Sequence, residues 1–243
     1  MNAVFGNLGD LIDRSRSAAD LDKPAIIDLS RGLQGRSVSY RELDDMAARV
    51  AGWLSGRGYA RGDRIAVLAA NCVEFLACFH GILRAGLVAV NVNPLYTPRE
   101  LEHQLKDSGA IAIVVVENFA QVVEQAIAHT QPLQVITTQV GDLLPAPKRW
   151  LVNWVAKRVK KLVPAWNIAG SVRLRDALAQ GARAGFKPVP IAREDLALLQ
   201  YTGGTTGVSK GAMLTHRNIL ANVAQTGTWI SQHFVAGHEV AIA

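Results

Sequence analysis

The chain has 243 residues, of which 49% are hydrophobic, 19% charged and 6% aromatic, and its 26 Lys and Arg exceed its 20 Asp and Glu. This length and apolar fraction can bury a substantial core, so the composition predicts a globular protein and excludes a disordered or collagen-like chain. The two cysteines, Cys72 and Cys78, lack the spacing of a metal-binding or redox pair. We therefore expect buried thiols in a reducing compartment and no zinc site.

The first twenty residues contain acidic side chains and no apolar run of the kind that forms a signal-peptide core, which argues against export. The most apolar tract, residues 65–92, is interrupted by Asn71, Glu74, His80 and Arg84. It therefore predicts strand, helix and strand in place of a membrane span. From these two features we expect a cytoplasmic protein with no transmembrane helix.

Short β-branched runs alternate with segments of helical periodicity, which is typical of βαβ units around a largely parallel sheet. Ser39 and Thr97 each begin a capping box, and their helices are predicted to end near Gly58 and Gly109. Asn71 is the predicted cap of the helix between them. Strands are predicted at 64–69, 88–92, 111–116, 134–138 and 196–201. The expected fold class is α/β, with parallel sheets flanked by helices.

Residues 145–167 differ in composition from the rest of the chain. They include six basic residues and no acidic one, which matches the formal net charge of +6 of the whole chain. On a helix over 148–163, seven apolar residues share one arc, two tryptophans flank it, and most basic residues lie opposite. The apolar residues are Leu151, Val152, Val155, Ala156, Val159, Leu162 and Val163, the tryptophans are Trp150 and Trp154, and the basic residues are Lys148, Arg149, Lys157, Arg158, Lys160 and Lys161.

This basic segment fits two placements. Basic residues facing anionic head groups, with tryptophans at the interface, are typical of a helix on a membrane surface, here the inner face. A helix that packs on its own domain and leaves a basic face in solvent gives the same pattern. Nucleic acid is disfavoured as a partner, because the excess charge is confined to this segment and no recognised binding motif accompanies it.

Residues 201–211, YTGGTTGVSKG, follow the predicted strand 196–201, and within them residues 202–211 hold four Gly, three Thr, one Ser and one Lys. Glycines let backbone N–H groups turn around an anion, hydroxyls add donors or metal ligands, and Lys210 adds a movable positive charge. The spacing is not that of a Walker A motif, because Val208 and Ser209 precede Lys210. Composition alone also fits a flexible surface loop. A position between a strand and a helix capped near Thr215 favours phosphate, because open α/β sheets bind ligands at the carboxyl ends of their strands.

The stretch 201–218, YTGGTTGVSKGAMLTHRN, resembles the phosphate-loop motif of the adenylate-forming superfamily, which includes acyl-CoA synthetases, luciferases and peptide-synthetase adenylation domains. Most members carry Ser where Gly203 stands and Pro where Ser209 stands, and the TGGTTG variant resembles that of bacterial long-chain fatty acid–CoA ligases. The stretches NLGDLIDRSR, GILRAGLVAVNVNPLYTPRELEHQLKDSGA and WLVNWVAKRVKKLVP also resemble those ligases, so the resemblance covers nearly the whole chain.

The resemblance implies an ATP-dependent reaction in two steps. A fatty acid carboxylate attacks the α-phosphorus of ATP to give acyl-adenylate and pyrophosphate, and the thiol of coenzyme A then displaces AMP. The resemblance implies Lys210 as the catalytic residue, with its ammonium group moving with the phosphates. It also implies that the Thr202 hydroxyl approaches Mg²⁺. The residues implied to bind the nucleotide are Tyr201, Thr202, Gly203, Gly204, Thr205, Thr206, Gly207, Val208, Ser209, Lys210 and Gly211. His216 and Arg217 are expected to cap or pair locally.

Members of this superfamily are much longer, so the resemblance implies an incomplete N-terminal domain over 1–243, with the adenine, ribose, acyl and coenzyme A sites largely beyond Ala243. We expect the isolated chain to be inactive or a weak phosphate binder. Two alternatives stay open: a non-catalytic relative that acts at membranes, and a ligase for another carboxylic acid. The final residues, EVAIA, are expected to present an unpaired strand edge, which would favour homodimers or aggregation.

Overall fold

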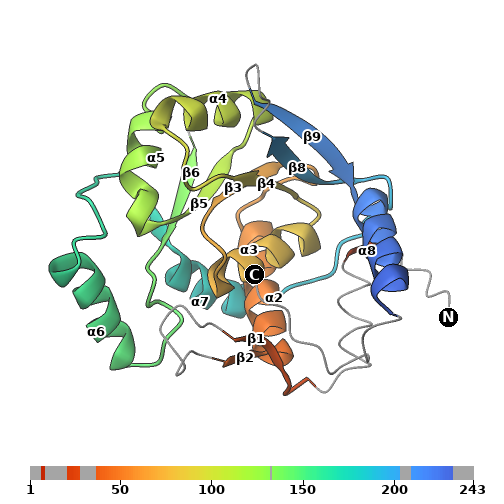
Figure 1. The fold of residues 1–243 in the computed structure, drawn as a ribbon, viewed down its shortest axis with the longest axis horizontal. Coiled ribbons are helices and arrows are strands. Elements are labelled where there is room, and N and C mark those ends of the chain that lie inside the picture. Colours follow the sequence, from red (N-terminus) through yellow and green to blue (C-terminus); the bar gives the residue numbers. More distant parts are fainter. Residues whose placement is uncertain (1–6, 9–20, 28–36, 132, 203–208, 232–243) are drawn as a thin grey trace.

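A seven-stranded sheet forms the centre of the molecule, with the strand order β7-β6-β5-β3-β4-β8-β9 (Figure 1). The computed structural model describes residues 7–8, 21–27, 37–131, 133–202 and 209–231. Neighbouring strands are parallel except β8 and β9, which are antiparallel. The strands are β3 (Arg64–Leu68), β4 (Val88–Val92), β5 (Ala112–Val116), β6 (Gln134–Thr138), β7 (Val172–Arg173), β8 (Leu196–Thr202) and β9 (Lys210–Thr215). This architecture confirms the expected α/β class.

Helices cover both faces of the sheet. Alternate strand residues point to opposite sides, and apolar residues on both sides pack against these helices. Ile65 and Val67 of β3 pack with α2 (Tyr40–Gly56), α3 (Val73–Arg84) and α7 (Leu174–Ala184). Ala66 and Leu68 pack on the other face with α4 (Pro98–Ser108) and α5 (Ala120–Ile127), which follows a 3-10 helix at Glu117–Phe119. A separate antiparallel pair is formed by β1 (Pro24–Ile27) and β2 (Ser37–Ser39).

Three of the four predicted helix starts are confirmed, at Ser39, at Thr97 and at Thr215, which caps the helix over His216–Ile230. The capping boxes at Ser39 and Thr97 are both formed, with reciprocal hydrogen bonds between the cap and the third helical residue. Helix α4 ends at Gly109, whose φ of 62° is the left-handed conformation that glycine adopts without a steric penalty. The prediction for α3 was wrong by one residue, because Cys72 and not Asn71 occupies the cap position.

The two cysteines are free thiols, and Cys78 is fully buried while Cys72 is partly so. Burial raises the pKa of Cys72 to about 12, and it raises the pKa of Cys78 as well. Both thiols therefore stay protonated and unreactive at neutral pH. The prediction of a buried thiol is confirmed for Cys78.

The basic segment is helical over a shorter range than predicted. Helix α6 (Lys148–Trp154) continues as a π-helical turn over Val155–Val159. The backbone N–H of Lys160 donates to Val155 O at 2.8 Å, and Lys161 then takes a φ of 49°, which ends the helix. Leu162 and Val163 therefore lie beyond the helix, and the single apolar arc expected over 148–163 is not formed.

The side of α6 that meets the domain is anchored by one polar residue. The Asn153 side chain accepts a hydrogen bond from Gly141 N and donates one to Gln139 Oε1, both at 2.8 Å. Val152, Val155 and Ala156 beside it are half-buried, whereas Trp150, Leu151 and Trp154 are 64%, 62% and 58% exposed. The segment thus packs on its own domain and still leaves two tryptophans in solvent.

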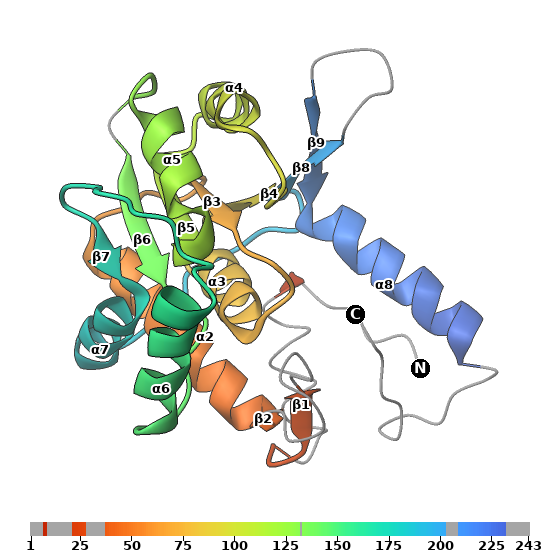
Figure 2. The same ribbon diagram turned by 60° about the vertical axis from the view of Figure 1, so that its left-hand side comes forward.

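Strand β9 and helix α8 (His216–Ile230) form one border of the molecule, with α8 extending away from the sheet (Figure 2). Strand β9 was not predicted from the sequence. The exposed apolar residues here include Met213, Val223 and Trp229. The predicted edge at EVAIA lies outside the described residues. Among the helices of the described ranges, none is both long and apolar enough to cross a membrane.

Candidate functional site

The antiparallel pairing of β8 and β9 brings five of the predicted site residues together. Thr202 pairs with Lys210, and Tyr201 pairs with Gly211. Ser209 precedes β9, and its hydroxyl donates to Thr202 O at 3.0 Å. The remaining predicted residues, Gly203, Gly204, Thr205, Thr206, Gly207 and Val208, lie outside the described residues. Because Tyr201 and Thr202 end β8 while Lys210 and Gly211 begin β9, residues 203–208 connect two strands of a hairpin, and not a strand and a helix as predicted.

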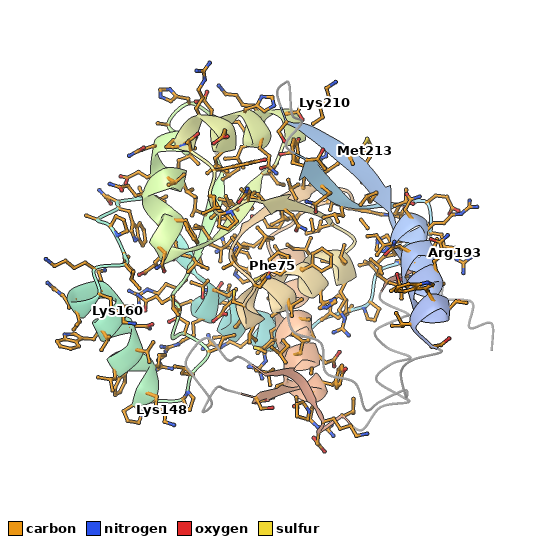
Figure 3. All side chains as sticks on the ribbon, viewed as in Figure 1. Phe75, Lys148, Lys160, Arg193, Lys210 and Met213 are labelled. Carbon is orange, nitrogen blue, oxygen red and sulfur yellow. The ribbon has the colours of Figure 1, made fainter. Side chains whose placement is uncertain are left out.

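This hairpin end lies where an open α/β sheet binds ligands. Strand β8 is parallel to β4, so Thr202 marks the carboxyl edge of the parallel strands. Figure 3 shows Lys210 at the same end of the hairpin, beside α4. A pocket of about 330 Å³ opens at this edge, and its lining residues are Asn91, Val92, Asn93, Tyr96, Gln200 and Tyr201. Backbone and side-chain groups of the hairpin can therefore meet a ligand seated on the sheet edge.

Thr202 and Lys210 are both exposed. Their pairing in the β8–β9 register places a hydroxyl and an ammonium group on neighbouring strands at the same level of the hairpin. A hydroxyl can donate to an anion or bind a cation, and an ammonium supplies a positive charge on a flexible stem. Together the two groups suit a ligand that carries several negative charges.

Tyr201 supports the hairpin from inside. Its side chain is 8% exposed, and its hydroxyl donates to Asp107 Oδ2 of α4 at 2.5 Å. Burial, together with the adjacent Asp107 carboxylate, raises the pKa of Tyr201. The phenol therefore stays protonated and keeps donating at any physiological pH.

The structure adds residues that the sequence analysis did not select. The hydroxyl of Tyr96 lies 3.4 Å from Ser209 Oγ, and the Nε2–H of His103 donates to Ser209 O at 3.3 Å. The Asn91 side chain donates to Gln200 Oε1 at 3.1 Å and so joins β4 to β8. Tyr96 and His103 belong to the NVNPLYTPRELEHQ stretch, but about a hundred residues separate them from the hairpin. Sequence spacing gives no signal for such contacts.

His216 is buried at the start of α8 and packs inside the molecule. It is the first residue of α8, next to the cap Thr215, and its side chain is 1% exposed. The backbone N–H of Leu8 donates to His216 Nδ1 at 3.3 Å, so its partner is distant in sequence and not local as expected. Burial lowers the pKa of His216, although the nearby Asp195 opposes this shift. A buried neutral imidazole that accepts a backbone hydrogen bond fits a role in packing.

The chain matches known proteins over nearly its whole length. A family model described as AMP-binding enzyme matches residues 14–242. The long-chain-fatty-acid–CoA ligase of Haemophilus influenzae is 49% identical over 218 residues, which are 89% of this chain and 38% of that protein. The ligase of the same name from Escherichia coli O157:H7 is 44% identical over 239 residues, 98% of this chain and 42% of that protein.

A solved structure shows the same fold. The crystal structure of ATP-bound MatB from Rhodopseudomonas palustris is similar with a TM-score of 0.66 and 29% identity, over 93% of this chain and 38% of that chain. This chain thus spans about two fifths of the length of the curated relatives that it matches. Since the family model covers almost every residue and the YTGGTTGVSKG segment joins two strands at the carboxyl edge of the sheet, the chain belongs to the AMP-binding enzyme family.

Proposed function

We propose that this chain is the N-terminal part of a ligase that activates a long-chain fatty acid with ATP and transfers the acyl group to coenzyme A. The observation that carries the proposal is the β8–β9 hairpin, which presents Thr202 and Lys210 at the ligand-binding edge of the sheet. Two relatives named as long-chain-fatty-acid–CoA ligases, at 44% and 49% identity, support a long-chain fatty acid as the substrate. The ATP-bound structure of MatB supports ATP as the nucleotide.

In the proposed first step negative charge develops on the departing pyrophosphate, and the site has to stabilise it. An oxygen of the fatty acid carboxylate bonds to the α-phosphorus, and the bond from that phosphorus to the oxygen bridging to the β-phosphate breaks. Pyrophosphate leaves with the bonding electrons and carries several negative charges. Lys210 can follow this charge on its flexible stem, while the Thr202 hydroxyl donates or binds a cation beside it. The coenzyme A thiol then attacks the acyl carbonyl, and AMP leaves.

The donor set fits Mg²⁺ only together with the nucleotide. Thr202 offers an exposed hydroxyl oxygen, which is a ligand of the kind that Mg²⁺ accepts. Over the described ranges of the chain, no group of three His, Cys, Asp or Glu side chains could hold a metal ion. Phosphate oxygens and water would therefore complete the coordination. When bound, the ion would neutralise part of the triphosphate charge.

A ligase for another carboxylic acid is the alternative within the same family. The pocket at the sheet edge is lined mainly by polar residues such as Asn91, Asn93 and Gln200. This lining suits a polar or phosphorylated ligand better than an alkyl chain, so it does not indicate which carboxylic acid is the substrate. Comparing a long-chain fatty acid, a medium-chain acid and an aryl acid in one exchange assay separates these alternatives.

The test uses an extended chain, defined here as these 243 residues followed by the remaining sequence of the Haemophilus influenzae relative. Fatty acid-dependent exchange of labelled pyrophosphate into ATP is measured. Lys210→Ala should slow the exchange about 10²-fold, which is typical of losing one donor that stabilises developing charge. Lys106→Ala, an exposed lysine on α4, is the control. Exchange at the wild-type rate in Lys210→Ala would rule out the role assigned to Lys210.

A specific observation favours a second role, at a membrane surface. Trp150 and Trp154 are exposed in a segment with six basic residues and no acidic one, so apolar and cationic groups are presented together. In Figure 3, Lys148 and Lys160 lie at the outer border, away from Lys210. We propose that the protein is cytoplasmic and binds the inner face of the membrane through this segment, either as the ligase or as a non-catalytic relative.

Vesicle sedimentation tests the membrane role. Vesicles with anionic phosphatidylglycerol should bind the chain, purely zwitterionic vesicles should bind it more weakly, and added salt should release it. The double substitution Trp150→Ser and Trp154→Ser should weaken binding, whereas Trp229→Ser on α8, also exposed, should not. Changing Lys157, Arg158, Lys160 and Lys161 to Gln should weaken binding too. Equal binding by the wild type and both variants would reject the surface.

We also propose that the chain forms a homodimer or larger assembly when it is purified alone. Among the strands of the described residues, β9 is an edge of the seven-stranded sheet, and it exposes Met213. Unpaired N–H and C=O groups along such an edge can pair with a second copy. Analytical ultracentrifugation should show a mass that rises with concentration, and a constant monomer mass would contradict the proposal.

A further inference from the structure

We propose that helix α4 fixes the distance between the two strand ends of the β8–β9 hairpin, with His103 and Asp107 as positioning residues. This inference rests on the proposed function, because the strand ends carry the groups assigned to the phosphates. It adds a part of the machinery that lies about a hundred residues before the glycine-rich segment. The contact between α4 and the hairpin can also be measured without any activity.

The geometry places one contact on each side of residues 203–208. His103 and Asp107 are four residues apart on α4, so their side chains lie on the same face of the helix. His103 Nε2–H donates to Ser209 O at 3.3 Å, just before β9. Asp107 Oδ2 accepts from the Tyr201 hydroxyl at 2.5 Å, near the end of β8. A single rigid helix therefore holds both ends of the connection.

Helix α4 is itself firmly held. Leu101 and Leu105 are almost fully buried in the core on the face of the sheet that α4 and α5 cover. The Gln104 side chain, also fully buried, donates to Asn91 O at 2.8 Å and joins the helix to β4. The capping box at Thr97 fixes the start of the helix. Movement of α4 relative to the sheet would break the leucine packing and the Gln104 hydrogen bond, so the helix can act as a fixed reference.

The hairpin alone would be a weak scaffold. Among the described residues β9 is an edge strand in which no residue is buried, and the end of an edge pair opens easily without further packing. Thr202 and Lys210 stand at that end. A displacement of about 1 Å in a binding group can cost a reaction about 10²-fold, so the α4 contacts are expected to affect the use of ATP.

Hydrogen exchange on the 243-residue chain tests the contact directly. Asp107→Ala and His103→Ala should each raise the exchange rate of backbone amides in 209–213, by about tenfold, as local opening becomes easier. Tyr201→Phe, which removes only the hydroxyl, should resemble Asp107→Ala. Lys106→Ala, which loses an exposed pair with Glu102 on the same helix, is the control and should match the wild type. Unchanged exchange in all three test variants would overturn the proposal.

Kinetics on the extended chain test the positioning role. Asp107→Ala and His103→Ala should lower kcat/KM for ATP about tenfold or more while KM for the fatty acid stays constant. Asp107→Asn keeps an acceptor for Tyr201 and should recover most of the loss. Faster amide exchange with wild-type kinetics would overturn the positioning role. An extended wild-type chain without any exchange activity would reject the proposed function, and the amide exchange would still decide whether α4 holds the hairpin.

Discussion

Tyr201 and Gly211 face each other across the β8–β9 pair, and the tyrosine ring occupies the space where a side chain at position 211 would begin. A Cβ added to Gly211 would lie 2.8 Å from Tyr201 Cε2 and 2.9 Å from Cζ. Real Cβ atoms do not approach other atoms this closely. The glycine therefore lets the ring lie over β9 while its hydroxyl reaches Asp107.

Gly211→Ala should destabilise the chain by about 1–3 kcal/mol, because the methyl group forces the Tyr201 ring away from its packed position. The free energy of unfolding from urea titration is the measurement. The control is Gly227→Ala in α8, where an added Cβ meets no atom within 4 Å. Replacing glycine in a helix interior should stabilise by about 0.5–1 kcal/mol. Equal effects of the two substitutions would show that the ring can move without cost.

The Asp44–Arg84 ion pair joins α2 to α3 and should matter far more than a surface pair. The Arg84 side chain is 7% exposed, it contacts the Asp44 carboxylate, and its Nη1 donates to Asp44 O at 3.2 Å. Asp44→Ala should cost about 1–3 kcal/mol of unfolding free energy, because the buried guanidinium loses its carboxylate acceptor while its hydrogen bond to the backbone oxygen of residue 44 remains.

Asp45→Ala is the matched control on the same helix, because it removes the exposed i,i+4 pair with Arg49. That change should cost about 0.5 kcal/mol or less. Adding Arg84→Met to Asp44→Ala should recover part of the stability, since the guanidinium is then removed while most of its stem is kept. A double variant as unstable as the sum of the two single variants would mean that the pair is not coupled.

The stability of the chain should fall in mildly acidic solution because of His80. Burial lowers the pKa of His80 to about 4, and Arg84 one turn later adds repulsion. The imidazole of His80 becomes protonated near pH 6.5 in the unfolded chain and only near pH 4 in the folded chain. The free energy of unfolding should therefore decrease as the pH falls from about 6.5 to 4, by about 1.4 kcal/mol per pH unit from this residue.

Urea titrations at several pH values measure this slope. His80→Gln should flatten it between pH 6.5 and 4, leaving a smaller slope in the same direction, because burial also lowers the pKa of His216. His129→Gln, which removes an exposed histidine, should follow the wild type. A His80→Gln variant with the wild-type slope would place the acid sensitivity elsewhere.

Local patterns in the sequence determine most elements of this fold. The capping boxes at Ser39 and Thr97 are complete within four residues, so the helix starts are readable without any tertiary contact. The run over Ala112–Val116 is apolar throughout, as expected of a strand that is buried on both faces, and all five residues are buried. The YTGGTTGVSKG segment also carries its chemistry in its own residue types, which is why the family could be inferred from it.

Strand β9 shows where local patterns fail. Its residues, KGAMLT, include glycine, alanine and lysine, which have low strand propensity and no clear alternation. Pairing with β8 forms this strand, and pairing depends on a partner and not on the segment itself. The π-helical turn after α6 is a similar case, because helical periodicity predicts a continuous arc that the backbone at Val155–Val159 does not follow.

The sequence by itself determined the α/β class and the helix starts at Ser39, Thr97 and Thr215, and it predicted the residues that could meet a phosphate. Only the tertiary structure decided that Thr202 stands opposite Lys210, that Tyr201 lies over Gly211, and that α4 forms hydrogen bonds near both strand ends. The physical reason is range. Capping and periodicity act within a few residues, whereas the contacts that shape the site join segments about a hundred residues apart and exist only after the chain has folded.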